Sequence, residues 1–222
     1  MIGTIVIWIA FAAALTSAWD YFQVVRRKKE SLTLARRSFH IMVLGVVLSS
    51  FLLLMFILQH RFEYAYVYSY SSRSLPLGYL FSTFYAGQEG SFLFWAFSGA
   101  IIGIFLLNYT RRKRIEAEVI SIYVSIQAFL LLLLIAKSPF RSIWDVFPGQ
   151  VAAGVVPSDG RGLNPLLQNF WMTIHPPVLF VGFAAMAVPF SFAAAALWRK
   201  KYQDWLASAF PWVLFAVLAL GA

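Results

Sequence analysis

The sequence predicts an all-α integral membrane protein with about six transmembrane helices. Of its 222 residues, 61% are hydrophobic and only 12% are charged, whereas a soluble domain carries roughly 25% charged residues. The apolar residues fall into runs of about 20, which is the length that crosses the hydrocarbon core. The basic residues concentrate in alternate connections between these runs. A typical soluble enzyme is therefore excluded, and residues 1–222 are expected to form a single transmembrane bundle.

The six predicted spans are the apolar runs of the sequence, in order from the N-terminus. They cover residues 2–25, about 39–58, 92–107, about 119–136, about 177–198 and a last run that begins near 205 and is still apolar at 222. The first run does not resemble a cleaved signal peptide, because no basic residue precedes it and no cleavage pattern with a polar mature chain follows it. Over half of the chain is thus expected to lie in lipid.

Basic residues mark one side of the predicted bundle. Of the 18 Lys and Arg residues, 13 lie in the first, third and fifth connections, namely Arg26, Arg27, Lys28, Lys29, Arg36, Arg37, Arg111, Arg112, Lys113, Arg114, Arg199, Lys200 and Lys201. By the positive-inside rule these connections are cytoplasmic, so the N-terminus, the two long loops and whatever follows the sixth span face outward. The formal charge of +9 is then an orientation signal, and no nucleic-acid partner is expected.

The first outward loop, about residues 59–90, has an unusual order of aromatic residues. Alternate positions carry tyrosine, so an extended segment would place four rings on one face: Tyr64, Tyr66, Tyr68 and Tyr70. These rings could be ordinary interfacial anchors or a dedicated ligand platform, and interfacial tyrosines are the commoner case. The loop ends in Gly87-Gln88-Glu89-Gly90, where Glu89 would gain from a helix N-terminus. The flanking glycines suggest that the backbone approaches another group closely.

The second outward loop, about residues 137–175, contains a predicted amphipathic helix. Asn164 and Pro165 form a good N-cap and first-turn pair. The residues that follow place one apolar face opposite a polar one, which is typical of a short helix lying on the outer membrane surface; that apolar face comprises Leu166, Leu167, Phe170, Trp171 and Ile174. Pro176 and Pro177 are expected to end this helix and to open the fifth span, which would hold His175 at the corner between them.

Histidines are the candidate metal ligands, because the chain has no cysteine. Disulfides, thiolate sites, a cysteine nucleophile and haem attachment through a CxxCH motif of its own are all excluded. A neutral imidazole at the position of His175 could ligate iron, although an interfacial histidine is more often simply a polar residue at a helix end. His40 and His60 would lie roughly 30 Å apart on one continuous helix and could not share a metal.

Three passages of the sequence carry a resemblance to a known family. They are Ser74-Leu75-Pro76-Leu77 with Tyr79, then Ala86-Gly87-Gln88-Glu89-Gly90-Ser91 with Leu93 and Trp95, and finally residues 159–168 (DGRGLNPLLQ) running into Ile174-His175-Pro176-Pro177. With this order and topology, the chain resembles the CcmF family of cytochrome c biogenesis proteins. That family belongs to a wider group of membrane haem-handling proteins that includes the CcmC and CcsA types.

The resemblance implies a function. The family couples haem to apocytochrome c at the outer face of the membrane, through thioether bonds to a CxxCH motif. His175 matches the family's first outward histidine and would be an axial ligand of the haem iron. The resemblance also implies b-type haem as substrate or bound cofactor, in the bacterial inner (plasma) membrane with the functional loops facing the periplasm.

Further site residues follow from this interpretation. Arg141 and Arg161 are candidates to meet haem propionates, because a guanidinium fork matches a carboxylate, and solvated loop charges remain an equal alternative. Trp171, on the apolar face near His175, is a candidate haem contact. Gln88 stands where typical members have a histidine, so no ligand is assigned to that position.

The family's Trp-rich (WWD) loop and three further histidines would come after the sixth span, so the chain resembles the N-terminal part of the family. It is expected to be a fragment or a naturally split subunit of a haem lyase (holocytochrome c synthase), inactive as this chain alone. Implied partners are apocytochrome c, a haem chaperone, thioredoxin-like and apocytochrome-binding maturation subunits, and a polypeptide supplying the C-terminal remainder, all within the lipid bilayer.

Two other function classes stay open beside the haem lyase component. A transporter of haem or another small solute would need polar residues near mid-membrane, and the apolar runs contain few of them. A non-catalytic structural membrane subunit would need no ligand at all.

Overall fold

The computed structural model describes residues 2–26, 30–203 and 205–221, and this part of the chain is helical without named strands. Five helices are long and apolar enough to cross a membrane: α1 (Ile2–Val25), α2 (Ser31–Leu58), α5 (Gln88–Lys113), α6 (Glu116–Ala136) and α8 (Phe170–Arg199). The sixth predicted span corresponds to α9 (Trp205–Gly221), which is apolar but has 17 described residues. The predicted all-α membrane fold is confirmed.

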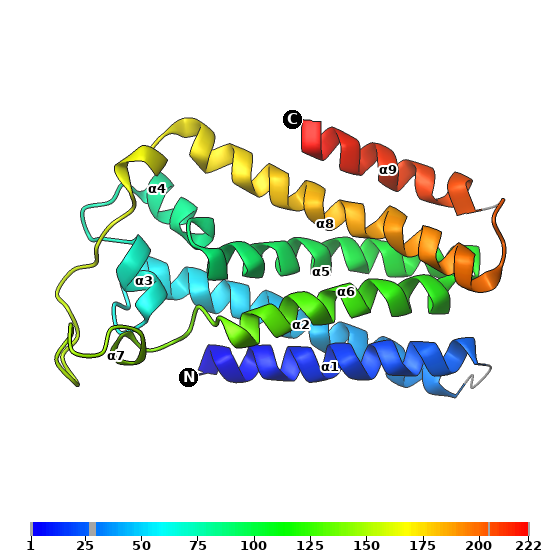
Figure 1. Ribbon diagram of the computed structural model, residues 1–222, viewed down its shortest axis with the longest axis horizontal. Helices are drawn as coiled ribbons and strands as arrows, with labels where there is room; N and C mark the ends of the chain where they lie inside the picture. The colour runs from blue at the N-terminus through cyan, green and yellow to red at the C-terminus, as the bar shows by residue number, and fades with distance from the viewer. Residues whose placement is uncertain (1, 27–29, 204, 222) are drawn as a thin grey trace.

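The long helices form one bundle in which small residues allow close packing. Helices α1 and α2 lie side by side, α6 packs against α1, α5 and α8, and α9 packs on α8 at the edge (Figure 1). At the α1–α2 contact, a Cβ on Gly45 would come within 2.8 Å of the Ala10 Cβ. Small residues at such contacts let helix backbones approach closely, and the resulting van der Waals packing favours helix association in lipid.

The two ends of the bundle differ in construction. The end with the long loops, here called the loop end, carries the short helices α3 (Ala65–Tyr70), α4 (Leu77–Ser82), η1 (Thr83–Tyr85), α7 (Ile143–Val146) and η2 (Pro165–Leu167). The opposite end, here called the basic end, carries the short connections α1–α2, α5–α6 and α8–α9 (Figure 1). Of the 13 residues predicted to mark the cytoplasmic side, Arg27, Lys28 and Lys29 lie outside the described residues.

Ion pairs tie the helices together at the basic end. The Arg36 guanidinium donates from Nε and Nη2 to the Glu116 carboxylate at 2.7 and 2.6 Å, so this pair is bidentate. The Tyr21 hydroxyl donates to the same carboxylate at 2.9 Å, and Arg199 pairs with Glu118 at 3.2 Å. These contacts join α1, α2, α6 and α8, because each links side chains of different helices.

The prediction of a short interfacial amphipathic helix that ends before Pro176 is wrong. Asn164 does cap a turn, since its side chain accepts from the Leu166 N–H at 3.0 Å, but that turn is the three-residue η2. Helix α8 then begins at Phe170 and continues through Pro176 and Pro177, which lie inside it. The prolines are the seventh and eighth residues of α8, so each removes one intrahelical hydrogen bond near its start.

The predicted alternation of tyrosine rings on one extended face is not what the structure shows. Residues 65–70 form helix α3, so the rings separate at about 100° per residue. Tyr66 and Tyr70, four residues apart, lie together with ring centroids 4.8 Å apart. Tyr64 instead stacks on Phe56 at 4.4 Å, which places it against the end of α2.

Candidate functional site

His175 lies in the second turn of α8, at the loop end. The helix is started by Asn169, whose side chain accepts from the Met172 N–H at 3.0 Å. The side chain of His175 is exposed. Trp171 lies four residues earlier, so both side chains are on one face of the helix. The structure therefore presents an imidazole and an indole together on a regular helix rather than on a loop.

A hydrogen bond from η1 supports α8 where the prolines interrupt it. Pro177 has no N–H, so the carbonyl of Thr173 loses its usual intrahelical donor. The Tyr85 hydroxyl donates to this carbonyl oxygen at 2.6 Å. Tyr85 is therefore a positioning residue for the turn that carries His175. Sequence reasoning missed it, because the order of residues does not reveal a contact across 88 positions.

The surface beside His175 is apolar. Trp171 is 71% exposed and Phe170 65% exposed, and their rings meet edge to face at 5.5 Å. Leu166 and Ile174 are also exposed on this side of the loop end. An exposed group of large apolar side chains at the end of a span can contact lipid or bind an apolar ligand.

The segment Asp159-Gly160-Arg161-Gly162 binds to the C-terminal end of α3. The Arg161 N–H donates to the Tyr68 carbonyl at 2.7 Å and the Gly162 N–H to the Ser71 carbonyl at 3.1 Å. The helix end thus obtains donors that its own backbone cannot supply. A Cβ on Gly160 would overlap the Ser71 carbonyl oxygen, and Gly162 has a φ of +81°, so both positions require glycine.

Asp159 fixes the start of this segment. Its carboxylate accepts from the backbone N–H of Arg73 at 2.9 Å and of Gly160 at 2.7 Å. These two hydrogen bonds, with smaller contributions from the charges of Arg73 and His60, hold the pKa of Asp159 below its ordinary value. Arg73 also donates from Nε to the Ser158 carbonyl at 2.9 Å, which closes the turn.

Arg161 is held between aromatic rings on the α3–α7 side of the loop end. Its guanidinium carbon lies 4.5 Å from the Phe147 ring centroid and 5.3 Å from that of Tyr68. Its Nη2 donates to the Gln150 side chain at 3.2 Å. A guanidinium over aromatic rings can still bind a carboxylate through the N–H groups in its own plane.

Arg141 lines a small cavity of about 220 Å³ between α3, α5 and the segment before α7. The cavity also contains the Glu89 carboxylate and the Tyr70 ring. The Arg141 carbonyl accepts from the Ala65 N–H at 3.0 Å, so its backbone is fixed to the start of α3.

The Gly87-Gln88-Glu89-Gly90 passage is a packing element. Glu89 is in the first turn of α5, as expected. A Cβ on Gly87 would overlap the Tyr70 ring, and a Cβ on Gly90 would overlap the Tyr66 hydroxyl and the Phe84 carbonyl. The close approach predicted from the two glycines is therefore confirmed, and the approaching groups belong to the protein itself.

Tyr66 is the buried partner of this passage, and sequence reasoning did not separate it from its neighbours. Its hydroxyl donates toward the carbonyls of Thr83 and Phe84, each at 2.9 Å, and accepts from the Gly87 N–H at 3.1 Å. Burial raises the pKa of Tyr66 well above its ordinary value, so the hydroxyl remains protonated. The side chain of Gln88 accepts from Lys137 Nζ at 2.7 Å, which joins the start of α5 to the end of α6.

The predicted site residues fall into two groups. His175 and Trp171 lie at the start of α8 beside η1, whereas Arg141 and Arg161 lie beside α3 and α7 (Figure 1). Within the described residues, no hydrogen bond or ion pair joins the two groups, and no three His, Asp or Glu side chains gather to hold a metal ion. His60 belongs with the second group, because its ring lies 5.8 Å from that of Phe62.

Comparison with known proteins decides the family. The model of the family described as cytochrome C assembly protein matches residues 85–221, which include α5, α6, α8 and α9. The chain belongs to this family. It is 33% identical over 164 residues to the cytochrome c-type biogenesis protein CcmF of Pseudomonas fluorescens, covering 72% of this chain and 24% of that protein. Escherichia coli CcmF is 28% identical over 212 residues, covering 94% of this chain and 31% of that protein.

A solved structure has the same fold as this chain. The cytochrome c heme lyase CcmF superposes with a TM-score of 0.71 over 96% of this chain and 33% of that protein, at 23% identity. CycK of Bradyrhizobium diazoefficiens, another cytochrome c-type biogenesis protein, is 30% identical over 88% of this chain and 29% of its own length. The chain thus spans about a quarter to a third of the length of the relatives it matches, and it is a multi-pass membrane protein of the CcmF type.

Proposed function

We propose that this chain serves cytochrome c maturation as a component of a haem lyase. In this proposal it presents haem at the loop end for thioether attachment to the CxxCH motif of apocytochrome c. Membership of the cytochrome c assembly family supports the class of reaction. The proposed haem site is supported by one observation: the exposed imidazole of His175 lies beside exposed Trp171 on one face of α8.

The face of α8 suits haem as a substrate. Haem has an apolar macrocycle, an iron with two axial positions and two carboxylates on one edge. The neutral imidazole of His175 can offer one ring nitrogen to iron, while Trp171, Phe170 and Leu166 supply apolar surface for the macrocycle. The vinyl chemistry belongs to haem and to the client's thiols, so this chain contributes binding and orientation.

Arg161 and Arg141 are proposed to bind carboxylates at the same end. The guanidinium of Arg161 is positioned by the Phe147 and Tyr68 rings and by a hydrogen bond to Gln150. Both residues lie on the α3–α7 side, so a haem whose iron is on His175 would reach them only when its propionate edge points across the loop end. A propionate contact requires this orientation of haem, whereas a solvated arginine in the loop requires none.

We propose that a second polypeptide segment supplies the other axial ligand. His40 lies near the start of α2, toward the basic end, and hydrogen bonds through Nδ1 to the Arg36 carbonyl at 2.7 Å. His60 lies beside Phe62 in the other group of the loop end. One histidine gives one axial position, so the chain is proposed to act with apocytochrome c, a haem chaperone, thioredoxin-like and apocytochrome-binding subunits and further CcmF-type sequence, with the loop end outside the bacterial inner membrane.

The experiment replaces His175 with Ala in the complete maturation assembly. Cytochrome c in membranes is then stained for covalent haem, with His40→Ala as a matched control at the other end of the bundle. We expect His175→Ala to abolish the stain, His40→Ala to retain it, and added imidazole to restore part of the signal. Unchanged haem-staining cytochrome in His175→Ala would contradict the proposal.

A further inference from the structure

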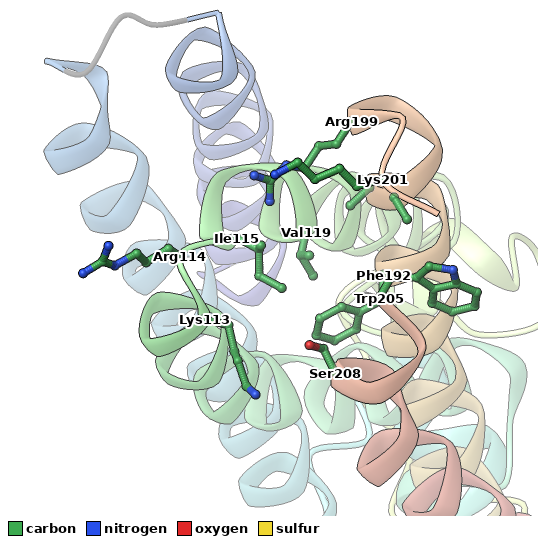
Figure 2. A pocket seen from close by; sticks show the side chains of 11 residues that line it. Lys113, Arg114, Ile115, Val119, Phe192, Arg199, Lys201, Trp205 and Ser208 are labelled. Atoms are coloured by element: carbon green, nitrogen blue, oxygen red, sulfur yellow. The ribbon is translucent and has the colours of Figure 1, made fainter. Parts of the chain in front are cut away.

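A basic cavity lies at the basic end, away from the proposed haem surface. It has a volume of about 300 Å³ and is bounded by the C-terminal ends of α5 and α8 and by the starts of α6 and α9 (Figure 2). Its charged and polar lining residues are Lys113, Arg114, Arg199, Lys201 and Ser208, with Phe192 and Trp205 as aromatic neighbours. The Arg114 side chain points away from the aromatic side of the cavity (Figure 2). These side chains come from segments far apart in the sequence, so the cavity is a product of the fold.

The charge of this cavity is only partly neutralised by the protein. Arg199 pairs with Glu118 at 3.2 Å. Lys113 Nζ lies 5.8 Å from the Tyr109 ring centroid, and neither Lys113 nor Lys201 has a carboxylate partner among the residues that the structure describes. A cavity with several cationic groups and the Ser208 hydroxyl matches an anion with several acceptor oxygens, such as a phosphate.

An apolar groove lies next to the cavity, further along the bundle. It measures about 620 Å³ and lies between α5, α8 and α9, where Phe97, Ile101 and Phe105 form one wall. Tyr109 stands between the two spaces: it lines the groove, and its hydroxyl donates at 3.0 Å to the carbonyl of Ser208, which lines the cavity.

Trp212 also lines the groove. It is one helical turn from Ser208 on α9, about 6 Å further from the basic end. The glycerol part of a phospholipid whose phosphate occupies the cavity would lie at about the depth of this residue.

We propose that an anionic phospholipid binds here, with its phosphate in the basic cavity and one acyl chain in the groove. Basic pockets between spans at the cytoplasmic side bind anionic headgroups in membrane proteins. Free inorganic phosphate would use the cavity alone and would leave the apolar groove without a partner. A cationic surface at the end of the bundle followed by an apolar surface further along it therefore matches a lipid, and this inference does not depend on the proposed haem function.

The test measures lipid retained by the purified full chain. Native mass spectrometry in detergent compares phosphatidylglycerol, phosphatidylcholine of the same chain length and inorganic phosphate. The variant Lys113→Gln/Lys201→Gln removes two exposed cavity cations. The matched control Arg37→Gln/Arg112→Gln removes two exposed charges from the same end outside the cavity, so both variants carry the same net charge.

We expect one phosphatidylglycerol per chain, with retention at least tenfold weaker in the lysine variant and unchanged in the control. Filling the groove with Ile101→Trp should weaken retention of long-chain phosphatidylglycerol. Because this variant keeps both lysines, it separates binding of the acyl chain from attraction by charge alone. Equal retention of phosphatidylcholine, unchanged retention in the lysine variant, or displacement of the lipid by equimolar inorganic phosphate would each overturn the proposal.

Discussion

Tyr85 shows how one hydroxyl maintains the helix that carries His175. Its hydrogen bond to the Thr173 carbonyl replaces the donor that Pro177 cannot supply. Replacing Tyr85 with Phe keeps the ring and removes this donor. We expect a loss of about 0.5–1.5 kcal/mol in the free energy of unfolding, the usual size for one hydrogen bond. Faster hydrogen exchange confined to the first turns of α8 would locate the effect.

The control for this change is Tyr79→Phe, because the Tyr79 hydroxyl makes no hydrogen bond to any described residue. Its exchange pattern should equal that of the unmodified chain. Equal exchange in Tyr85→Phe as well would show that α8 is maintained across the prolines without this contact.

Asp159 makes the loop end sensitive to acid. Its folded-state pKa lies below the ordinary value of 3.8 because the Arg73 and Gly160 N–H groups bind the charged form. The contribution to stability is therefore fully present above the unfolded pKa and is lost as the pH falls through the lower folded pKa. Between pH 5 and about pH 3, we expect the thermal midpoint to fall further in the unmodified chain than in Asp159→Asn.

Asp145→Asn serves as the control for this pH dependence, because Asp145 is an exposed carboxylate on the same side of the molecule. It should show the same decrease with acid as the unmodified chain. An identical decrease in Asp159→Asn would mean that its hydrogen bonds do not contribute to stability.

Some features of individual residues could be predicted from the sequence, and others could not. The close approach at Gly87 and Gly90 could be predicted, because it follows from a local rule on glycines. The predicted corner at His175 was wrong, because Pro176 and Pro177 lie inside α8 and do not end a helix before it. The role of Tyr66 could not be predicted, because its contacts with Gly87 and Phe84 join segments that only the fold brings together. The separation of His175 and Arg161 into two groups could not be predicted for the same reason.

At the scale of elements, α3 depends on the start of α5. The absence of a side chain at Gly90 lets the Tyr66 hydroxyl and the Phe84 carbonyl occupy the space that a Cβ would take. We expect Gly90→Ala to lower the free energy of unfolding by about 1–3 kcal/mol, as overpacking of a tight contact does. The measurement is the unfolding midpoint of the purified chain in detergent.

Gly78→Ala is the matched control, because a Cβ at Gly78 would meet no atom within 4 Å. This change should leave the midpoint unchanged or raise it slightly, since alanine favours the helix α4 in which Gly78 lies. Equal midpoints for the two alanine variants would show that the α3–α5 contact can relax at no cost.

Elements were predicted well where apolar runs are long and less well where they are short. The cores of α1, α2, α5 and α6 follow from composition, because a span needs about 20 apolar residues wherever it lies. The start of α8 was misplaced, since Pro176 and Pro177 usually end a helix and here receive support from η1. Helix α3 was hidden because alternating tyrosines favour a strand locally.

At the scale of the whole molecule, the distribution of charge predicts how the bundle is oriented in the membrane. The short connections with Arg26, Arg114 and Lys200 all lie at one end of the bundle, and the long loops lie at the other (Figure 1). Two ion pairs at the basic end, Arg36–Glu116 and Arg199–Glu118, use some of these charges to join helices. By the positive-inside rule, the remaining exposed cations predict that this end lies on the cytoplasmic side.

The absence of cysteine makes this orientation directly testable, because each single-cysteine variant then carries one thiol. Ala153 is exposed in the second long loop and Gln203 is exposed between α8 and α9. In intact spheroplasts, a membrane-impermeant maleimide should label Ala153→Cys, whereas Gln203→Cys should react only after permeabilisation. Ala14→Cys, buried in α1, should react in neither case. Labelling of Gln203→Cys from outside would reverse the predicted orientation and place the surface of His175 on the cytoplasmic side, which would contradict the proposed function.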